Sequence, residues 1–137
     1  MSSIAGPNGD VWIDGKNNLL SANSANQNLL GEHNVILGYR AFGDEAGISH
    51  NMIAIGEGAA QYDTTTGDAR NIAIGYQAAF NNGGYNVTFL GREAGMNNDG
   101  DNVIGIGDYA GYSNLGMSVN ALGERAAPAN KGEEVNA

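Results

Sequence analysis

The stretch NIAIGYQAAFNNGGYN, residues 71–86, is followed at once by two stretches of the same length that share its pattern. They read VTFLGREAGMNNDGDN (87–102) and VIGIGDYAGYSNLGMS (103–118). In each, an aliphatic residue precedes a Gly, an Ala stands three positions after that Gly, and a polar segment with another Gly closes the unit. Self-similarity at a fixed period is the signature of a repeat architecture, so this unit decides the fold.

The unit occurs six times when the chain is aligned on the aliphatic-Gly pair. The aligned glycines, spaced by 18, 19, 16, 16 and 16 residues, are Gly38, Gly56, Gly75, Gly91, Gly107 and Gly123. A weaker copy begins at residue 28, and the copy after Gly56 carries a longer loop, residues 61–68. We therefore predict a repeat domain over 28–137, preceded by an N-terminal arm or cap over 1–27.

Aliphatic residues stand mostly three and one positions before each Gly, with a small residue often between them. Positions two apart share one face of a strand, and a run this short fits a strand better than a helix. We predict that these aliphatic side chains form the core of each coil: Val35, Leu37, Ile53, Ile55, Ile72, Ile74, Leu90, Ile104, Ile106 and Leu122.

The rest of the unit predicts a bend into a second short strand, and then a turn of Asn and Gly, which tolerate positive φ. Small residues at a tight inner corner indicate close packing: Ala41, Ala59, Ala78, Ala94, Ala110 and Ala126. Stacking such units about 4.8 Å apart gives an all-β parallel solenoid of about six coils of 16–19 residues. So thin a coil has little core, which predicts that copies of the chain pack against one another.

The stretches HNMIAIG (50–56) and RNIAIG (70–75) resemble the head repeats of trimeric autotransporter adhesins, the YadA-like family. The likeness extends loosely to 86–91 and 102–107 and covers roughly 28–137. It implies a left-handed parallel β-roll and an intertwined homotrimer. Similar Ala-Ile-Gly repeats occur in phage fibres and other virion appendages.

Charge and composition narrow the function classes. With 6 Lys and Arg against 15 Asp and Glu, the net charge is −9, which disfavours nucleic acid because phosphate binding depends on basic side chains. No apolar run approaches the length of a membrane span, and residues 1–7 lack a signal-peptide pattern. The chain has no Cys, so it has no disulfide or thiolate chemistry.

Three motifs are candidates for chemical sites. Residues 105–110 (GIGDYA) match a dinucleotide fingerprint, but they lie in a β repeat rather than before a helix. The Asn/Asp loop 97–102 lacks the bidentate Glu of a Ca²⁺ loop, and His33 and His50 lie one unit apart without further ligands. No grouping typical of acid–base catalysis repeats. We expect no enzyme activity, no cofactor and no metal.

Function is expected where the units differ. Tyrosines are favoured at interfaces, and the candidate surface-binding residues are Tyr62, Tyr76, Tyr109 and Tyr112. Val11, Trp12 and Ile13 form a candidate docking segment, with a folded cap over the first coil as the alternative.

We expect a non-enzymatic trimeric virion component, a phage fibre segment or a capsid or tail decoration protein. It would dock on other virion or surface-appendage proteins and present an outer face, with a host-surface glycan or protein as a possible ligand. The alternative is the receptor-binding head of a bacterial trimeric autotransporter adhesin at the cell surface. A carbohydrate-active enzyme on a β-solenoid is the third, least favoured interpretation.

Overall fold

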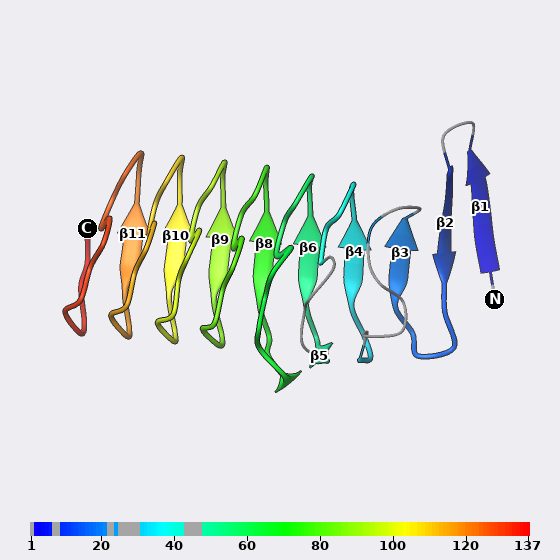
Figure 1. Ribbon diagram of the computed structural model, residues 1–137, viewed down its shortest axis with the longest axis horizontal. Coiled ribbons are helices and arrows are strands. Elements are labelled where there is room, and N and C mark those ends of the chain that lie inside the picture. Colours follow the sequence, from blue (N-terminus) through cyan, green and yellow to red (C-terminus); the bar gives the residue numbers. More distant parts are fainter. Residues whose placement is uncertain (1, 7–8, 22–23, 25–30, 43–47) are drawn as a thin grey trace.

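The computed structural model describes residues 2–6, 9–21, 24, 31–42 and 48–137. These residues form a β-solenoid of about six coils, which confirms the all-β, parallel repeat architecture predicted from the sequence. The coils stack along the long axis, with the N-terminus at one end and the C-terminus at the other (Figure 1).

One sheet runs along the whole stack. Its strands, in spatial order, are β1 (Ser2–Gly6), β2 (Gly9–Ile13), β3 (Leu19–Ser21), β4 (Val35–Leu37), β6 (Ile53–Ile55), β8 (Ile72–Ile74), β9 (Thr88–Leu90), β10 (Ile104–Ile106) and β11 (Asn120–Leu122). The β1–β2 and β2–β3 pairs are antiparallel, and the pairs from β3 to β11 are parallel. Register is strict, since equivalent residues of successive units pair, such as Ile53 with Ile72.

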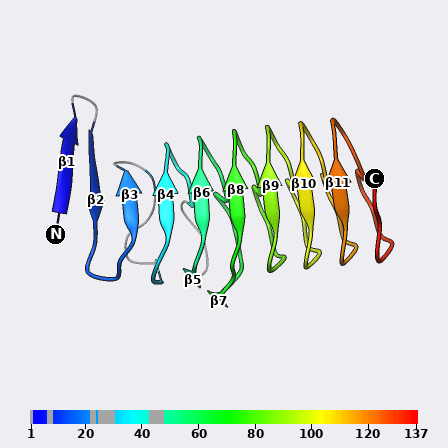
Figure 2. The same ribbon diagram turned by 180° about the vertical axis from the view of Figure 1, so that it is seen from behind.

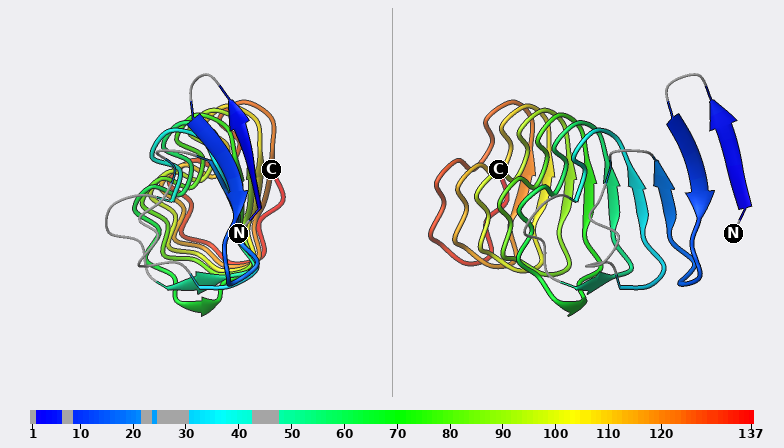
Figure 3. Two further views of the ribbon diagram at one scale, coloured as in Figure 1. Left: turned by 90° about the vertical axis from the view of Figure 1, so that its right-hand side faces the viewer. Right: turned by 45° about the vertical axis from the view of Figure 1, so that its right-hand side comes forward.

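The predicted arm and the stack share this sheet. β1 and β2 form a hairpin at the N-terminal end, beside the first coils (Figure 3). β3 lies within the predicted arm, yet Leu19 and Leu20 pair in parallel with Val35 and Ile36 of β4. The parallel stack therefore includes β3, and the predicted boundary at 27/28 lies outside the described residues.

The second strand predicted for every unit is wrong for the units of Gly75, Gly91, Gly107 and Gly123, in which a series of turns follows the aligned Gly instead. In the unit of Gly91, positive φ recurs at Glu93, Gly95 and Asn97. The Glu93 N–H donates to Tyr76 in the preceding coil (2.8 Å) and the Gly95 N–H to Ala110 in the following coil (2.9 Å). Hydrogen bonds made alternately to the preceding and the following coil satisfy the backbone groups of this segment, although it is not an extended strand. The segment between one strand and the next therefore needs small and polar residues rather than β-branched ones.

The side chains predicted to form the core lie on the outer face of the sheet instead. The ten aliphatic residues assigned to it are half-buried or exposed: Val35, Leu37, Ile53, Ile55, Ile72, Ile74, Leu90, Ile104, Ile106 and Leu122. The residue between them is the buried one: Ile36, Ala54, Ala73, Phe89, Gly105 or Ala121. The coil interior is narrow and accepts mostly small side chains, so the larger aliphatics lie on the outer face of the sheet.

Alanine and valine complete the interior. Ala41, Ala59, Ala78, Ala94 and Ala110 are fully buried within the chain's own coils, and Ala126 is partly buried. Val87, Val103 and Val119, which precede β9, β10 and β11, are also fully buried, although the sequence argument did not assign them to the core.

Phe89 and Phe42 are the largest side chains among the described core residues, and both are fully buried; Leu20, Ile36 and Met52 are buried with them. Three glycines surround the Phe89 ring: a Cβ at Gly95 would overlap the ring, one at Gly105 would lie 2.7 Å from it, and one at Gly111 would lie 3.3 Å from it. Missing methyl groups in three places thus make room for one benzyl group.

Candidate interaction surface and polar interior

The outer face of the parallel sheet is largely apolar. Two columns of mostly aliphatic side chains follow the strands, one at the first and one at the last position of each three-residue strand; the polar members are Ser21 in β3, Thr88 in β9 and Asn120 in β11. Ile74, Ile104, Ile106 and Leu122 are 37%, 39%, 41% and 60% exposed. Contiguous apolar patches are typical of interaction sites, whereas apolar residues exposed singly are not. We call these two columns the aliphatic face.

The opposite side of the interior holds a ladder of asparagine amides. Asn130, Asn114 and Asn98 each donate from Nδ2 to the Oδ1 of the Asn one coil nearer the N-terminus, at 3.0, 2.8 and 2.8 Å. Each also bonds the Gly two positions later in its own turn, as Asn98 does with the Gly100 carbonyl (2.8 Å). The ladder therefore ties neighbouring coils together and fixes each turn.

Asp63 ends this ladder. Its Oδ2 accepts from Asn82 Nδ2 at 3.0 Å and from Asn71 Nδ2 at 3.3 Å, while Oδ1 accepts from the Thr65 N–H (2.8 Å) and the Thr65 hydroxyl. Because the ladder donates toward the N-terminus, its first member needs only to accept, which suits a carboxylate. The Asp63 side chain has no exposed surface, and this burial raises its pKa although the hydrogen bonds act in the opposite direction.

The loop 61–68 departs from the repeat and builds a second, two-stranded sheet. β7 (Gly67–Asp68) pairs in parallel with β5 (Ser49–His50) beside the stack, where Figures 1 and 2 show both short strands at its lower edge. This pair of strands could not be predicted from the repeat, because neither strand has an equivalent in the other units. Its signal was the spacing itself, which lengthens to 18 and 19 residues around these segments.

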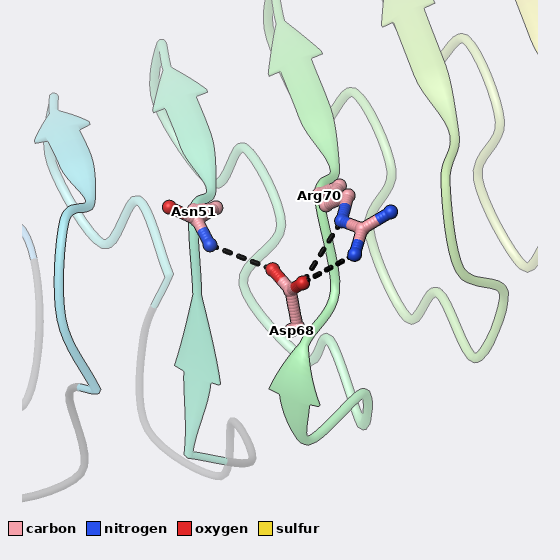
Figure 4. A network of polar contacts seen from close by, with 3 residues as sticks. All are labelled: Asn51, Asp68 and Arg70. Carbon is pink, nitrogen blue, oxygen red and sulfur yellow. Dashed lines mark hydrogen bonds and ion pairs between the residues drawn. The ribbon is translucent and has the colours of Figure 1, made fainter.

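A polar network lies on the surface of this small sheet (Figure 4). Asp68 accepts from Asn51 Nδ2 at 2.6 Å and from Arg70 Nε at 2.9 Å, and it forms an ion pair with the same guanidinium. The Arg70 hydrogen bonds, followed by the one from Asn51, hold the pKa of Asp68 below its usual range. All three residues are exposed, so the network contributes little to stability.

The four candidate tyrosines lie in different settings. Tyr62 packs edge-on against Phe80, with ring centroids 4.9 Å apart, and Tyr76 is 46% exposed. The ring centroids of Tyr109 and Tyr112 are 6.0 Å apart. The guanidinium carbons of Arg92 and Arg125 lie 5.0 and 5.6 Å from the centroid of the Tyr109 ring. Much of the predicted aromatic surface therefore makes contacts within the chain.

The candidate docking segment forms β2. Val11 is half-buried and Ile13 is 46% exposed, and β2 lies between β1 and β3 in the sheet. The side chain of Trp12 is outside the described part of the structure.

The motifs weighed as chemical sites have ordinary structural surroundings. Gly105 lies in the core against Phe89, and a turn rather than a helix follows it. In the loop 97–102, Asp101 accepts from the Tyr85 N–H (2.8 Å) and Asn98 belongs to the ladder. His50 Nδ1 accepts from the Glu32 N–H (3.0 Å). Within the described ranges, no group of three or more His, Cys, Asp and Glu residues could hold a metal ion.

The fold defines a β-solenoid protein with one apolar sheet face. Comparison with protein-family models, with curated proteins and with solved structures found no match. Among the residues that the structure describes, no helix is long and apolar enough to cross a membrane.

Proposed function

We propose that this protein is a non-enzymatic structural or attachment protein, a homotrimeric left-handed β-roll in a virion appendage or decoration. The aliphatic face carries the proposal. Full burial of an exposed Ile or Leu side chain contributes about 1.5–3 kcal/mol. The side chains of the aliphatic face are already partly buried, so each would contribute a fraction of this, and covering two columns of them favours association. A chain with a net charge of −9 has acidic groups enough to stay in solution around such a face.

A second copy of the chain is the partner whose surface best matches this face. The aliphatic side chains recur at the coil spacing of about 4.8 Å, and another copy presents the same columns at the same interval. Closed rings of identical subunits bury such a face completely, and the resemblance to the adhesin heads favours three subunits.

Attachment would use the surfaces that the trimer leaves open. The hairpin β1–β2 lies at one end of the rod, where Val11, Trp12 and Ile13 can dock on another virion protein. The exposed Tyr76 belongs to the outer surface that would meet a host glycan or protein. If the Trp12→Ala variant still binds to isolated virions, this segment has no docking role.

A pair of substitutions tests the role of the aliphatic face. Ile106→Lys places a charge in the aliphatic face, whereas Leu115→Lys places the same charge at an equally exposed apolar residue outside the sheet (41% and 50% exposed). Light scattering should give a monomer for Ile106→Lys and the unchanged oligomer for Leu115→Lys, because a buried unpaired charge is costly. Equal masses for the two variants would remove the aliphatic face as the contact.

A further inference from the structure

Asp63 differs chemically from every other described member of its column. The equivalent positions, seven residues after the aligned Gly, are Asn82, Asn98, Asn114 and Asn130, whose amides are neutral at all pH values. Asp63 is fully buried, and no cationic side chain contacts its carboxylate within the described part of the chain. The chain thus contains an ionisable group in a place where its own repeat uses an amide.

We propose that the coil containing Asp63 is a proton-responsive element, in which the buried carboxyl takes up a proton on acidification and the loop 61–68 becomes more stable as a result. The inference rests on the geometry around Asp63 and is independent of how copies of the chain assemble.

The hydrogen bonds around Asp63 suit the charged form. Four donor hydrogens reach its two oxygens, two from Thr65 and one each from Asn71 and Asn82. A buried carboxylate with four donors is well solvated by the protein, but it still lacks a neutralising charge.

A chain of hydroxyl groups also accommodates the neutral form. The proton on Asp63 Oδ1 can be donated to Thr65 Oγ1, and the Thr65 hydroxyl can then turn toward Ser49 Oγ, 3.2 Å away. The Ser49 hydroxyl already donates to the Thr65 carbonyl at 2.6 Å, so its oxygen is free to accept. Protonation therefore loses no hydrogen bond and removes the buried charge.

Other ionisable groups lie around this coil at the surface. His50, Asp68 and Arg70 belong to the small sheet, and Asp99 lies against Gly83 in the next turn. Asp44 and Glu45 of the preceding unit are outside the described residues. None of the described groups makes a hydrogen bond or an ion pair with Asp63, so its own burial dominates its behaviour.

The direction of the effect follows from linkage. Burial raises the pKa of Asp63 in the folded chain above its value of about 3.9 in the unfolded chain. The resulting stabilisation is fully present below the unfolded pKa and is lost as the pH rises through the folded pKa. Within that window, the folded-to-unfolded ratio changes by up to about tenfold per pH unit for this one proton.

Asp63→Asn in the full chain removes the ionisable group and keeps the size of the side chain, although its Nδ2 would face donors of Thr65 or of Asn71 and Asn82. That loss of hydrogen bonds does not depend on pH, so we expect the stability of the wild type relative to the variant, measured by thermal melting, to rise as the pH falls from neutral toward about 4. A difference that is independent of pH would overturn the proposal. Asp68→Asn is the control. The pKa of Asp68 is lowered in the folded chain, so the stability that its carboxylate contributes is present at neutral pH and disappears on acidification. This pH dependence is opposite in sign to the one expected for Asp63.

Carbon-13 NMR titration of the wild-type side chain gives an answer even if Asp63→Asn does not fold. The Asp63 carboxyl should titrate at a higher pH than the exposed Asp68 carboxyl, and the signals of Thr65 and Ser49 should shift at the same midpoint. An Asp63 midpoint at or below the ordinary Asp value would contradict the proposal.

Discussion

The glycine after each strand shows, at the scale of single residues, how closely the coils approach. Gly91 has φ +135°, and a Cβ built there would lie 2.6 Å from the Gly107 oxygen and 2.8 Å from its carbonyl carbon. Both are backbone atoms of the next coil, so no side-chain movement can relieve the overlap. This column therefore requires Gly for space as well as for conformation.

Two substitutions separate these requirements. Gly91→Ala combines a backbone strain of about 1–3 kcal/mol with the overlap, whereas Gly123→Ala, at φ +117° with nothing within 4 Å, has only the strain. We expect the Gly91 variant to lose clearly more free energy of unfolding in a denaturant titration. Equal losses at the two positions would mean that the coils can separate at no cost.

At the scale of the element, the coil that contains β9 is packed around one large side chain. The preceding coil has Ala73 and Ala79 where this one has Phe89 and Gly95. The pair Phe-Gly thus replaces the pair Ala-Ala with a similar fit to the same interior.

A double-mutant cycle tests that exchange. Phe89→Ala should cost about 3–5 kcal/mol through the cavity it leaves, and Gly95→Ala about 1–3 kcal/mol through overpacking against the ring. The double variant restores the Ala-Ala pair of the preceding coil, so its loss of stability should be smaller than the sum of the two. Additive losses in chemical unfolding would show that the two sites do not share space.

The elements also show how far sequence reasoning reaches. Spacing alone located β4, β6, β8, β9, β10 and β11, because each strand precedes an aligned Gly. It could not orient them, since a period of two gives two faces without saying which one is inside. Residue size suggested the aliphatic face for the core, but the narrow interior takes Ala54 and Ala73 instead of Ile53 and Ile72.

Features that the repeat does not mark could not be predicted from the sequence. β5 and β7 depend on a loop that occurs in one unit, and the turns after each Gly depend on positive φ at residues such as Gln77 and Ala79, which composition does not mark. The Asn ladder could be predicted as turn chemistry, but the burial of Asp63 at its end depends on the neighbouring coils.

At the scale of the whole molecule, the solenoid presents two unlike surfaces. The sheet runs along the stack on one side and the turns lie on the other sides (Figures 1 and 3). Tyr39 and Tyr76 are exposed in the turns, and Ile74, Ile104, Ile106 and Leu122 are exposed on the sheet. Apolar surface that stays hydrated costs about 25 cal/mol per Å². The association that we propose through this face would account for aliphatic side chains on the outside of the sheet.

The mass of the unmodified protein in dilute solution is the most direct test of this account. Native mass spectrometry, or sedimentation equilibrium at low concentration, should give three times the chain mass of 14.1 kDa, with no dissociation at moderate salt because the contact is apolar. A stable, folded species of 14.1 kDa would contradict the assignment of the aliphatic face as a contact between copies of the chain.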